Sequence, residues 1–315
     1  PDILNVNTKT LFEKAYGNFC IPAINISNPE QVTTLFSIAQ KYQAPFIVQT
    51  SPAAREYISA KMILSYIETT SINYPDVVYA VHLDHGNESH VHDAIASGQY
   101  TSVMIDASND QLEQNIARTK KVVQKAHPHN ISVEAELGVL SGVEDDLEVN
   151  EKNALFTDPN DVITFVKETH CDSLAVAVGT SHGAYKYSGR QGLRFDLLAE
   201  IQSKIPNFPI VLHGASQIDP DEIKRINNAG GNIMSSAKGI TDEEIKKAID
   251  LGVCKLNIAT DLRLLWTRVF REYFRDHSGE WDHLIPGKKY MEDLEKLIHK
   301  KFILLNCVNK NHLFK

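Results

Sequence analysis

Eight short runs of mostly apolar residues recur along the chain, and each predicts a buried β-strand. The runs at 77–81 and 174–178 are apolar at every position, which is typical of parallel strands covered on both faces. The predicted strands cover residues 19–25, 45–51, 77–84, 101–106, 131–137, 173–179, 209–213 and 253–258.

Longer segments with the apolar spacing of amphipathic helices alternate with these strands. They cover residues 29–42, 54–71, 88–97, 111–126, 159–169, 195–204, 220–228 and 242–251, and a further one at 261–276 follows the last strand. Eight strand–helix repeats favour a closed (β/α)8 barrel. An open doubly wound sheet is the alternative, but no Gly-x-Gly-x-x-Gly follows the first strand.

We therefore expect one α/β domain, a TIM barrel over residues 1–315 with an extra C-terminal helix at 290–305. The connections at 138–157 and 214–240 are too long for simple turns. Loops of this length in a compact domain are usually lids or binding loops, so both are candidates for contact with a substrate.

The amino-acid composition argues against several classes of protein. The 315 residues are 43% hydrophobic and 23% charged, as in ordinary globular domains, and the net charge of −8 does not suit nucleic-acid binding. The four cysteines form no Cys-x-x-Cys pair, which argues against a structural zinc cluster or a disulfide framework. With neither a membrane-spanning run of roughly 20 apolar residues nor a signal pattern at the start, we expect a cytoplasmic protein.

Polar residues stand at the carboxyl end of every predicted strand, where the active sites of α/β barrels are built. Three histidines at this rim, His85, His182 and His213, are each followed at once by glycine. Imidazole is the commonest metal ligand, and three protein ligands with an open position are typical of catalytic zinc. A rim or core histidine is the simpler interpretation of each one alone, but the three together predict a metal site.

Acidic residues accompany these histidines. Asp84 is the candidate acid or base, and its alternative role is to orient a histidine. Strict strand alternation puts Asp84 and His85 on opposite faces, so both reach the rim only if the strand ends there. Asp106, Glu134 and Glu136 could hold a second cation or hydrogen-bond the first ligands, and structural ion pairs are an equal alternative.

Turns rich in glycine and hydroxyl groups follow the later strands and predict an anion site. They contain Gly183, Gly214, Ser216 and Thr260, and Lys186 could add positive charge. Each turn alone is more simply a turn, so the prediction depends on their placement together.

Five segments together resemble the class II, metal-dependent ketose-bisphosphate aldolases, and the resemblance covers roughly residues 10–300. They are His82-Leu83-Asp84-His85-Gly86, Met104-Ile105-Asp106-Ala107-Ser108, Ser132-Val133-Glu134-Ala135-Glu136-Leu137-Gly138, Gly179-Thr180-Ser181-His182-Gly183 and Leu212-His213-Gly214-Ala215-Ser216.

The resemblance implies that His85, His182 and His213 bind one catalytic Zn²⁺ per chain, and Co²⁺ or Fe²⁺ would also suit such ligands. Asp106 and Glu136 would belong to a neighbouring or alternative metal position.

Catalytic and substrate-binding roles are implied in the same way. Asp84 would move the proton of the C4 hydroxyl, and Glu144 would exchange the proton on the dihydroxyacetone phosphate carbon. Arg263 would reach the second phosphate from a partner subunit, which implies a homodimer or homotetramer. The substrate and its phosphates, with Na⁺ or K⁺ nearby, would contact Asn25, Ser51, Gly183, Lys186, Gly214, Ser216, Asn257, Thr260 and Arg263.

The implied reaction is reversible cleavage of fructose 1,6-bisphosphate to dihydroxyacetone phosphate and glyceraldehyde 3-phosphate, through a zinc-stabilised enediolate. Ala259 stands where the fructose branch usually carries Asp, and this resembles the tagatose branch. Asp261, Leu262 and Arg263 resemble the fructose branch. Fructose 1,6-bisphosphate is therefore the expected substrate, and a tagatose-1,6-bisphosphate or other ketose-bisphosphate aldolase is the alternative.

Two other classes of protein compete with this interpretation. A Schiff-base aldolase using Lys255 or Lys186 as its nucleophile would leave the three histidines unexplained. A non-catalytic barrel would be free to lose Asp84 and Glu144, yet both are present.

Overall fold

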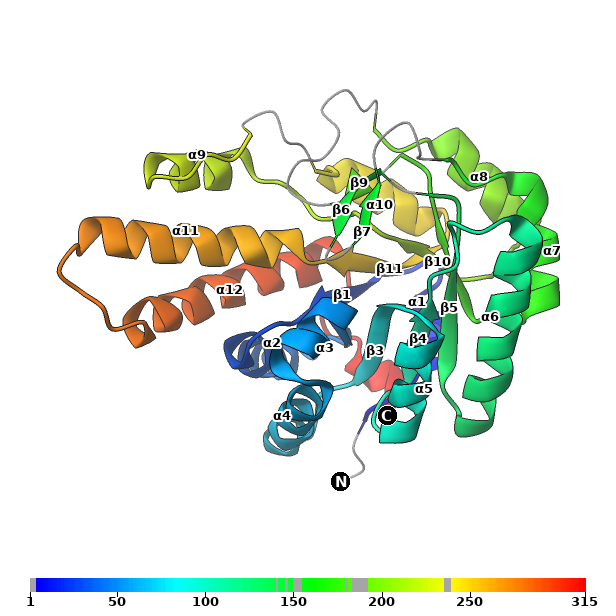
Figure 1. Ribbon diagram of the computed structural model, residues 1–315, viewed down its shortest axis with the longest axis horizontal. Coiled ribbons are helices and arrows are strands. Elements are labelled where there is room, and N and C mark those ends of the chain that lie inside the picture. The colour runs from blue at the N-terminus through cyan, green and yellow to red at the C-terminus, as the bar shows by residue number, and fades with distance from the viewer. Residues whose placement is uncertain are drawn as a thin grey trace.

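The computed structural model describes residues 4–139, 141–144, 147–149, 155–179, 181–182, 192–234 and 239–315. Within them, eight parallel strands close into a barrel in the order β1-β11-β10-β8-β5-β4-β3-β2, with helices around its outside (Figure 1). The strands are β1 (Ile21–Asn25), β2 (Phe46–Thr50), β3 (Tyr79–Gly86), β4 (Ser102–Ile105), β5 (Ser132–Leu137), β8 (Ser173–Val176), β10 (Ile210–Leu212) and β11 (Val253–Ile258).

The prediction of a (β/α)8 barrel is confirmed. All eight predicted strands are present, and their ends differ from the predicted ones by at most three residues. Nearly every strand residue is buried because one face points into the barrel and the other is covered by helices.

Helices follow the strands as the apolar spacing predicted, and five of them have the predicted bounds. The helices are α1 (Thr8–Ala15), α2 (Pro29–Tyr42), α3 (Pro52–Ile58), α4 (Ala60–Asn73), α5 (Glu88–Ser97), α6 (Leu112–Ala126), α7 (Pro159–Thr169), α8 (Phe195–Lys204), α9 (Pro220–Asn228), α10 (Asp242–Asp250), α11 (Thr260–Asp276) and α12 (Leu284–Leu304). No helix in these ranges is long and apolar enough to cross a membrane.

The prediction of one helix over 54–71 was wrong. Ser59 has a φ of 80°, which no α-helix accommodates, so α3 ends there and α4 begins at the next residue. The Ser59 side chain accepts a hydrogen bond from the backbone N–H of Met62 and caps α4.

One helix and one small sheet were not predicted from the sequence. Helix α1 lies at the amino-terminal side of the barrel strands and buries Leu11, Phe12 and Ala15. The connection at 138–157 contains β6 (Ser141–Glu144) and β7 (Leu147–Val149), which join β9 (Ser181–His182) in a small sheet with the order β7-β6-β9.

Helices α11 and α12 form a long pair that extends beyond the barrel, which we call the arm (Figure 1). This confirms the extra C-terminal helix, although α12 begins at Leu284, six residues before the predicted start at Tyr290. Arg268 of α11 is buried in the joint, with Nε 2.6 Å from Glu222 Oε1 of α9 and Nη1 3.0 Å from Asp293 Oδ2 of α12. These ion pairs hold α9 and the arm together.

Candidate active site

A β-bulge at the end of β3 brings Asp84 and His85 to the same place. Between Leu83 and Gly86 the strand advances three residues while its partner β4 advances two, from Val103 to Ile105. His85 takes a φ of 48°, which breaks the alternation of side chains, and Asp84 Oδ1 lies 3.7 Å from His85 Nε2. The expectation that both residues reach the rim only if the strand ends there was wrong, because β3 continues to Gly86 and the bulge brings the two side chains together.

Gly86 is required by this bulge for a reason that the sequence did not reveal. A Cβ at position 86 would lie 2.5 Å from Cδ2 of Leu83, a fully buried core side chain. Glycine therefore permits close packing of the core under His85.

His85 and His213 each have one ring nitrogen beside a carboxylate. His85 Nδ1 lies 2.8 Å from Asp106 Oδ2, and His213 Nε2 lies 2.6 Å from Glu134 Oε1. Because a carboxylate only accepts, the N–H of each neutral ring points to it. The other two nitrogens, His85 Nε2 and His213 Nδ1, are 3.1 Å apart, and in these tautomers of the neutral rings each presents a lone pair to the other.

Two facing lone pairs need a proton or a cation between them. Two imidazole nitrogens on one tetrahedral zinc ion would be about 3.3 Å apart, close to the observed separation. The donor atoms gather in two overlapping groups, Asp84–His85–His213 and His85–Asp106–Glu136, each with its ligand atoms within 4.8 Å of one another. Imidazole and carboxylate donors in this arrangement fit a divalent metal ion.

Two buried carboxylate oxygens beside these histidines support the same interpretation. Within the described part of the chain, neither Asp84 Oδ1 nor Glu136 Oε2 has a hydrogen-bond partner. Burial and the negative charge of Asp106 raise the pKa of Glu136 to about 8. A bound cation would give both oxygens a partner and would offset the cost of burying the Glu136 charge.

Two side-chain amides, Asn25 of β1 and Gln49 of β2, hold Asp84 in place. Its Oδ2 accepts a 3.0 Å hydrogen bond from Asn25 Nδ2, and Asn25 Oδ1 accepts one of 2.6 Å from Gln49 Nε2. These two hydrogen bonds fix the Asn25 amide with its amino group toward Asp84. The sequence reasoning gave Gln49 no role, although a fully buried amide in the apolar strand β2 was a signal that it contacts the site.

Asp106 is engaged on both carboxylate oxygens. Oδ2 contacts His85 and Oδ1 accepts a 2.8 Å hydrogen bond from Ser108 Oγ. Burial alone would raise the pKa of Asp106, but hydrogen bonds from His85 and Ser108 hold it far below its ordinary value. In this structure Asp106 orients His85, and its role as a ligand at a second metal position stays a prediction.

Lys255 is fully buried and forms an ion pair with Glu134, with 2.7 Å between Nζ and Oε2. Burial alone would raise the pKa of Glu134, but the charge of Lys255 and the hydrogen bond from His213 keep it well below its ordinary value. A Schiff-base nucleophile must be a neutral amine, whereas this lysine is the counter-charge of a carboxylate. The geometry therefore argues against Lys255 as a nucleophile.

Two residues of the predicted anion site, Ser216 and Thr260, come together at the start of α11. Ser216 Oγ accepts 3.2 Å hydrogen bonds from the backbone N–H groups of Ala259 and Thr260. The Asn257 amide is buried on β11, and neither its oxygen nor its nitrogen has a partner within the described ranges. Ser51 caps α3 through a hydrogen bond from the N–H of Ala54, so its contact with substrate stays a prediction.

Four predicted site residues are described only in part or not at all. Gly183 and Lys186 lie outside the described residues. The backbone of Glu144 is in β6 and that of His182 in β9, and these two strands pair in parallel with Gly142 opposite His182. Their roles stay predictions.

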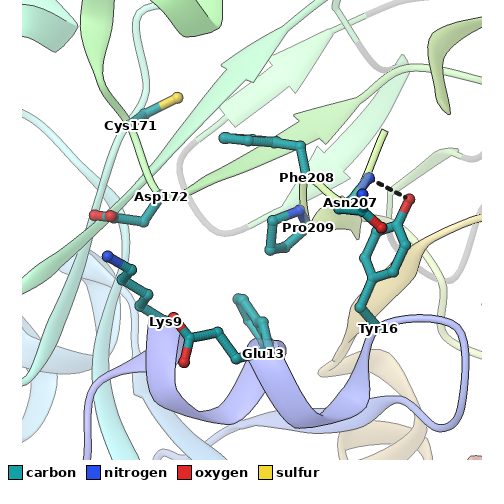
Figure 2. Close-up of a pocket in the computed structure, with 9 residues that line it drawn as sticks. Lys9, Glu13, Tyr16, Cys171, Asp172, Asn207, Phe208 and Pro209 are labelled. Carbon is teal, nitrogen blue, oxygen red and sulfur yellow. Dashed lines mark hydrogen bonds between the residues drawn. The ribbon is translucent and has the colours of Figure 1, made fainter. Parts of the chain in front are cut away.

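A hollow of about 550 Å³ opens at the opposite end of the barrel, beside α1 (Figure 2). Its lining includes Tyr16, which directly follows α1, and Pro209, which directly precedes β10. Active sites of α/β barrels lie at the carboxyl ends of the strands, so this hollow is distinct from the site around His85.

The chain matches the sequence model described as "Fructose-bisphosphate aldolase class-II" over residues 6–310. It belongs to this family. The prediction of a class II, metal-dependent aldolase, an aldehyde-lyase, is thereby confirmed.

Similar proteins cover nearly the whole length of the chain. It is 40% identical to a fructose-bisphosphate aldolase of Treponema pallidum (strain Nichols), over 97% of each sequence. It is also 40% identical to one of Thermus caldophilus, over 90% of this chain and 92% of that protein. The solved structure of the YdjI aldolase of Escherichia coli K12 superposes with a TM-score of 0.77 at 26% identity, covering 98% of this chain and 99% of that one.

Proposed function

We propose that this protein is a zinc enzyme that cleaves fructose 1,6-bisphosphate reversibly to dihydroxyacetone phosphate and glyceraldehyde 3-phosphate. The observation that carries the proposal is the pair of facing histidine nitrogens, 3.1 Å apart and beside the buried Asp84 carboxylate. His85 and His213 would hold the ion with His182 as the third ligand. Co²⁺ and Fe²⁺ suit the same donors.

Asp84 is the base that takes the C4 hydroxyl proton as the C3–C4 bond breaks. Its Oδ1 has no hydrogen-bond partner within the described residues, whereas Oδ2 is held by Asn25, so one oxygen is fixed and the other remains to accept a proton. When bound, the metal supplies Lewis-acid stabilisation of the negative charge that develops on the substrate oxygens. Glu144 would exchange the proton on the dihydroxyacetone phosphate carbon, and Asp106 with Glu136 would serve an alternative metal position.

The turns after the last barrel strands would bind the substrate. The hydroxyl groups of Ser216 and Thr260 at the start of α11 suit a phosphate, because helix amino termini attract anions. Gly183, Lys186, Gly214, Ser216 and Thr260 would bind this phosphate, with Na⁺ or K⁺ nearby. The buried amide of Asn257 would bind the triose, and Asn25 and Ser51 would contact neighbouring substrate atoms.

A homodimer or homotetramer would complete the site through Arg263. Arg263 is exposed on α11 and begins a stripe with Trp266, Phe270 and Phe274 at helical spacing, in which Trp266 is 43% and Phe274 38% exposed. Such an aromatic stripe suits contact with a second copy of the chain. We further propose that the chain is a single domain and acts in the cytoplasm.

Fructose 1,6-bisphosphate is proposed over the tagatose ester because the relatives that are 36–40% identical carry the name fructose-bisphosphate aldolase. The alanine at 259 is then a tolerated departure. Loss of that carboxylate removes one hydrogen-bond acceptor, which would weaken discrimination between the two sugars without abolishing the chemistry.

The proposal is tested by measuring triose phosphate release from the two ketose bisphosphates side by side, with and without EDTA. We expect kcat/KM for the fructose ester to exceed that for the tagatose ester by at least about tenfold, or about 1.4 kcal/mol. A preference for the tagatose ester would instead make Ala259 the deciding residue. Absence of cleavage with either ester and added zinc would favour a non-catalytic barrel.

A further inference from the structure

The interior of the barrel beside His213 holds a group of buried polar side chains that the proposed reaction does not use. Glu134, Lys255, His82 and Ser102 come from the four strands β5, β11, β3 and β4, and none is more than 1% exposed. Because four separate strands contribute, the group is assembled only when the barrel closes. We call it the inner polar group.

Glu134 is the centre of the inner polar group. Its Oε1 lies 2.6 Å from His213 Nε2, and its Oε2 lies 2.7 Å from Lys255 Nζ. His82 Nε2 is 3.2 Å from the same Oε2, and His82 Nδ1 is 2.7 Å from Ser102 Oγ. These contacts link Lys255 and His82 to Glu134 and, through it, to one nitrogen of His213.

Stability alone does not explain this arrangement. Removing a carboxylate and an ammonium from water costs more than their attraction usually returns, and a well-packed apolar pair of similar volume is often at least as stable. A fully buried charge pair in contact with a candidate metal ligand therefore suggests a functional role.

We propose that Glu134 is a positioning residue that fixes the tautomer and orientation of His213, and that Lys255 is the counter-charge that holds Glu134 in place. The inference rests on the metal site of the proposed function. A carboxylate only accepts hydrogen bonds, so His213 must carry its proton on Nε2, and Nδ1 presents its lone pair toward His85 Nε2, 3.1 Å away. Neither residue touches the substrate in this role.

Because Lys255 contacts Glu134, an amide at position 134 cannot replace the carboxylate without reversing the hydrogen bond to His213. In a Glu134→Gln variant the amide oxygen would turn to the Lys255 ammonium, because an amide N–H₂ repels it. The amide N–H₂ would then face His213 Nε2 and donate to it, which moves the ring proton to Nδ1, the nitrogen that the metal requires. Removing the ammonium as well, in Glu134→Gln/Lys255→Met, frees the amide to present its oxygen to His213 again.

The test is binding of Co²⁺ to the metal-free protein, measured as affinity in competition with a chelator and as the visible absorption spectrum. We expect Glu134→Gln to weaken Co²⁺ affinity by about 10- to 100-fold, the usual effect of losing an outer partner of a ligating histidine, and to alter the spectrum. The double variant should bind at least threefold more tightly than Glu134→Gln, while remaining weaker than wild type. A variant that bound Co²⁺ weakly only because it was less stable would not regain affinity when a second buried group was removed.

Arg268→Met is the matched control, because it also removes a buried, ion-paired cation but lies in the joint between α9 and the arm. It should be destabilised and still bind Co²⁺ like wild type. Wild-type affinity in either Glu134 variant, or a double variant no tighter than Glu134→Gln, would overturn the inference. If Glu134→Gln does not fold, the double variant decides: weaker binding with an altered spectrum supports the inference, and wild-type binding overturns it.

The wild-type titration separates this inference from the proposed function. No Co²⁺ binding by the wild-type protein would overturn the metal site itself and the inference with it. Normal binding by wild type with unchanged variants would overturn the inference alone.

Discussion

The β-bulge in β3 and the buried carboxylate of Glu134 fix the positions of His85 and His213 in the candidate site. The rim positions of Asp84, His85 and His213 were predictable because they follow apolar strands, and strand ends in a barrel share one rim. The contacts of Glu134 with Lys255 and His213 were not, because they join residues 121 and 79 positions apart that meet only in the closed barrel. The bulge that turns His85 was also hidden, since Gly86 alone does not predict it.

Gly86→Ala tests the bulge at the scale of one residue. The added methyl group would collide with Leu83, so we expect a loss of about 1–3 kcal/mol in the free energy of unfolding, as in other overpacked cores, together with weaker metal binding. Urea denaturation and Co²⁺ titration measure the two effects. Gly279→Ala is the control, because no atom lies within 4 Å of its added Cβ. Equal behaviour of the two variants would refute the steric requirement at position 86.

Asp84→Asn tests the proposed base. Removing a general base typically lowers a rate by about 10²- to 10⁴-fold, and we expect kcat to fall in this range while the metal content stays near that of wild type. Asp93→Asn on the exposed side of α5 should leave both unchanged. A kcat for Asp84→Asn within threefold of wild type would remove Asp84 from the mechanism.

At the scale of elements, most helices were predictable because their apolar spacing is set by the barrel that they cover. The break between α3 and α4 was not, because nothing about Ser59 signals its positive φ. Helix α1 was missed for a different reason: its polar outer face outweighs the three apolar residues that it buries.

Lys301→Met tests the contact between α12 of the arm and the residues beside Ser216. Lys301 of α12 is buried, and its Nζ lies 2.7 Å from Asp261 Oδ2 and 2.6 Å from Gln217 Oε1, beside Ser216. Removing one partner leaves Asp261 buried without its counter-charge, which costs about 3–5 kcal/mol of unfolding free energy. Lys300→Met, at the exposed neighbouring position, should cost less than about 0.5 kcal/mol. Urea denaturation of both variants decides, and similar losses would contradict the buried pairing.

For the whole molecule, the cysteines report whether the barrel is closed. All four are free and buried, and burial raises the pKa of Cys171 and Cys254 to about 12. Because the thiolate is the reactive form, we expect almost no reaction of the native protein with a disulfide reagent at pH 8, and four thiols per chain after denaturation in urea. Rapid reaction of any thiol in the native protein would show that part of the barrel opens.

The architecture and the chemical class were both accessible from the sequence, because eight alternating repeats and five rim motifs each point to one answer. What the structure adds is the pairing of two histidines with two carboxylates, which favours an N–H on each nitrogen beside a carboxylate and leaves the other two nitrogens facing each other. This arrangement is the physical basis of the claim that the enzyme depends on a metal.

Removal and return of the metal tests that claim most directly. The protein would be assayed for cleavage of fructose 1,6-bisphosphate as purified, after EDTA treatment and dialysis, and after addition of one equivalent of Zn²⁺ per chain, with bound metal measured at each stage. We predict about one metal ion per chain before treatment, loss of cleavage with the metal, and recovery with one equivalent. Cleavage that persists in metal-free protein would contradict the metal site formed by His85 and His213.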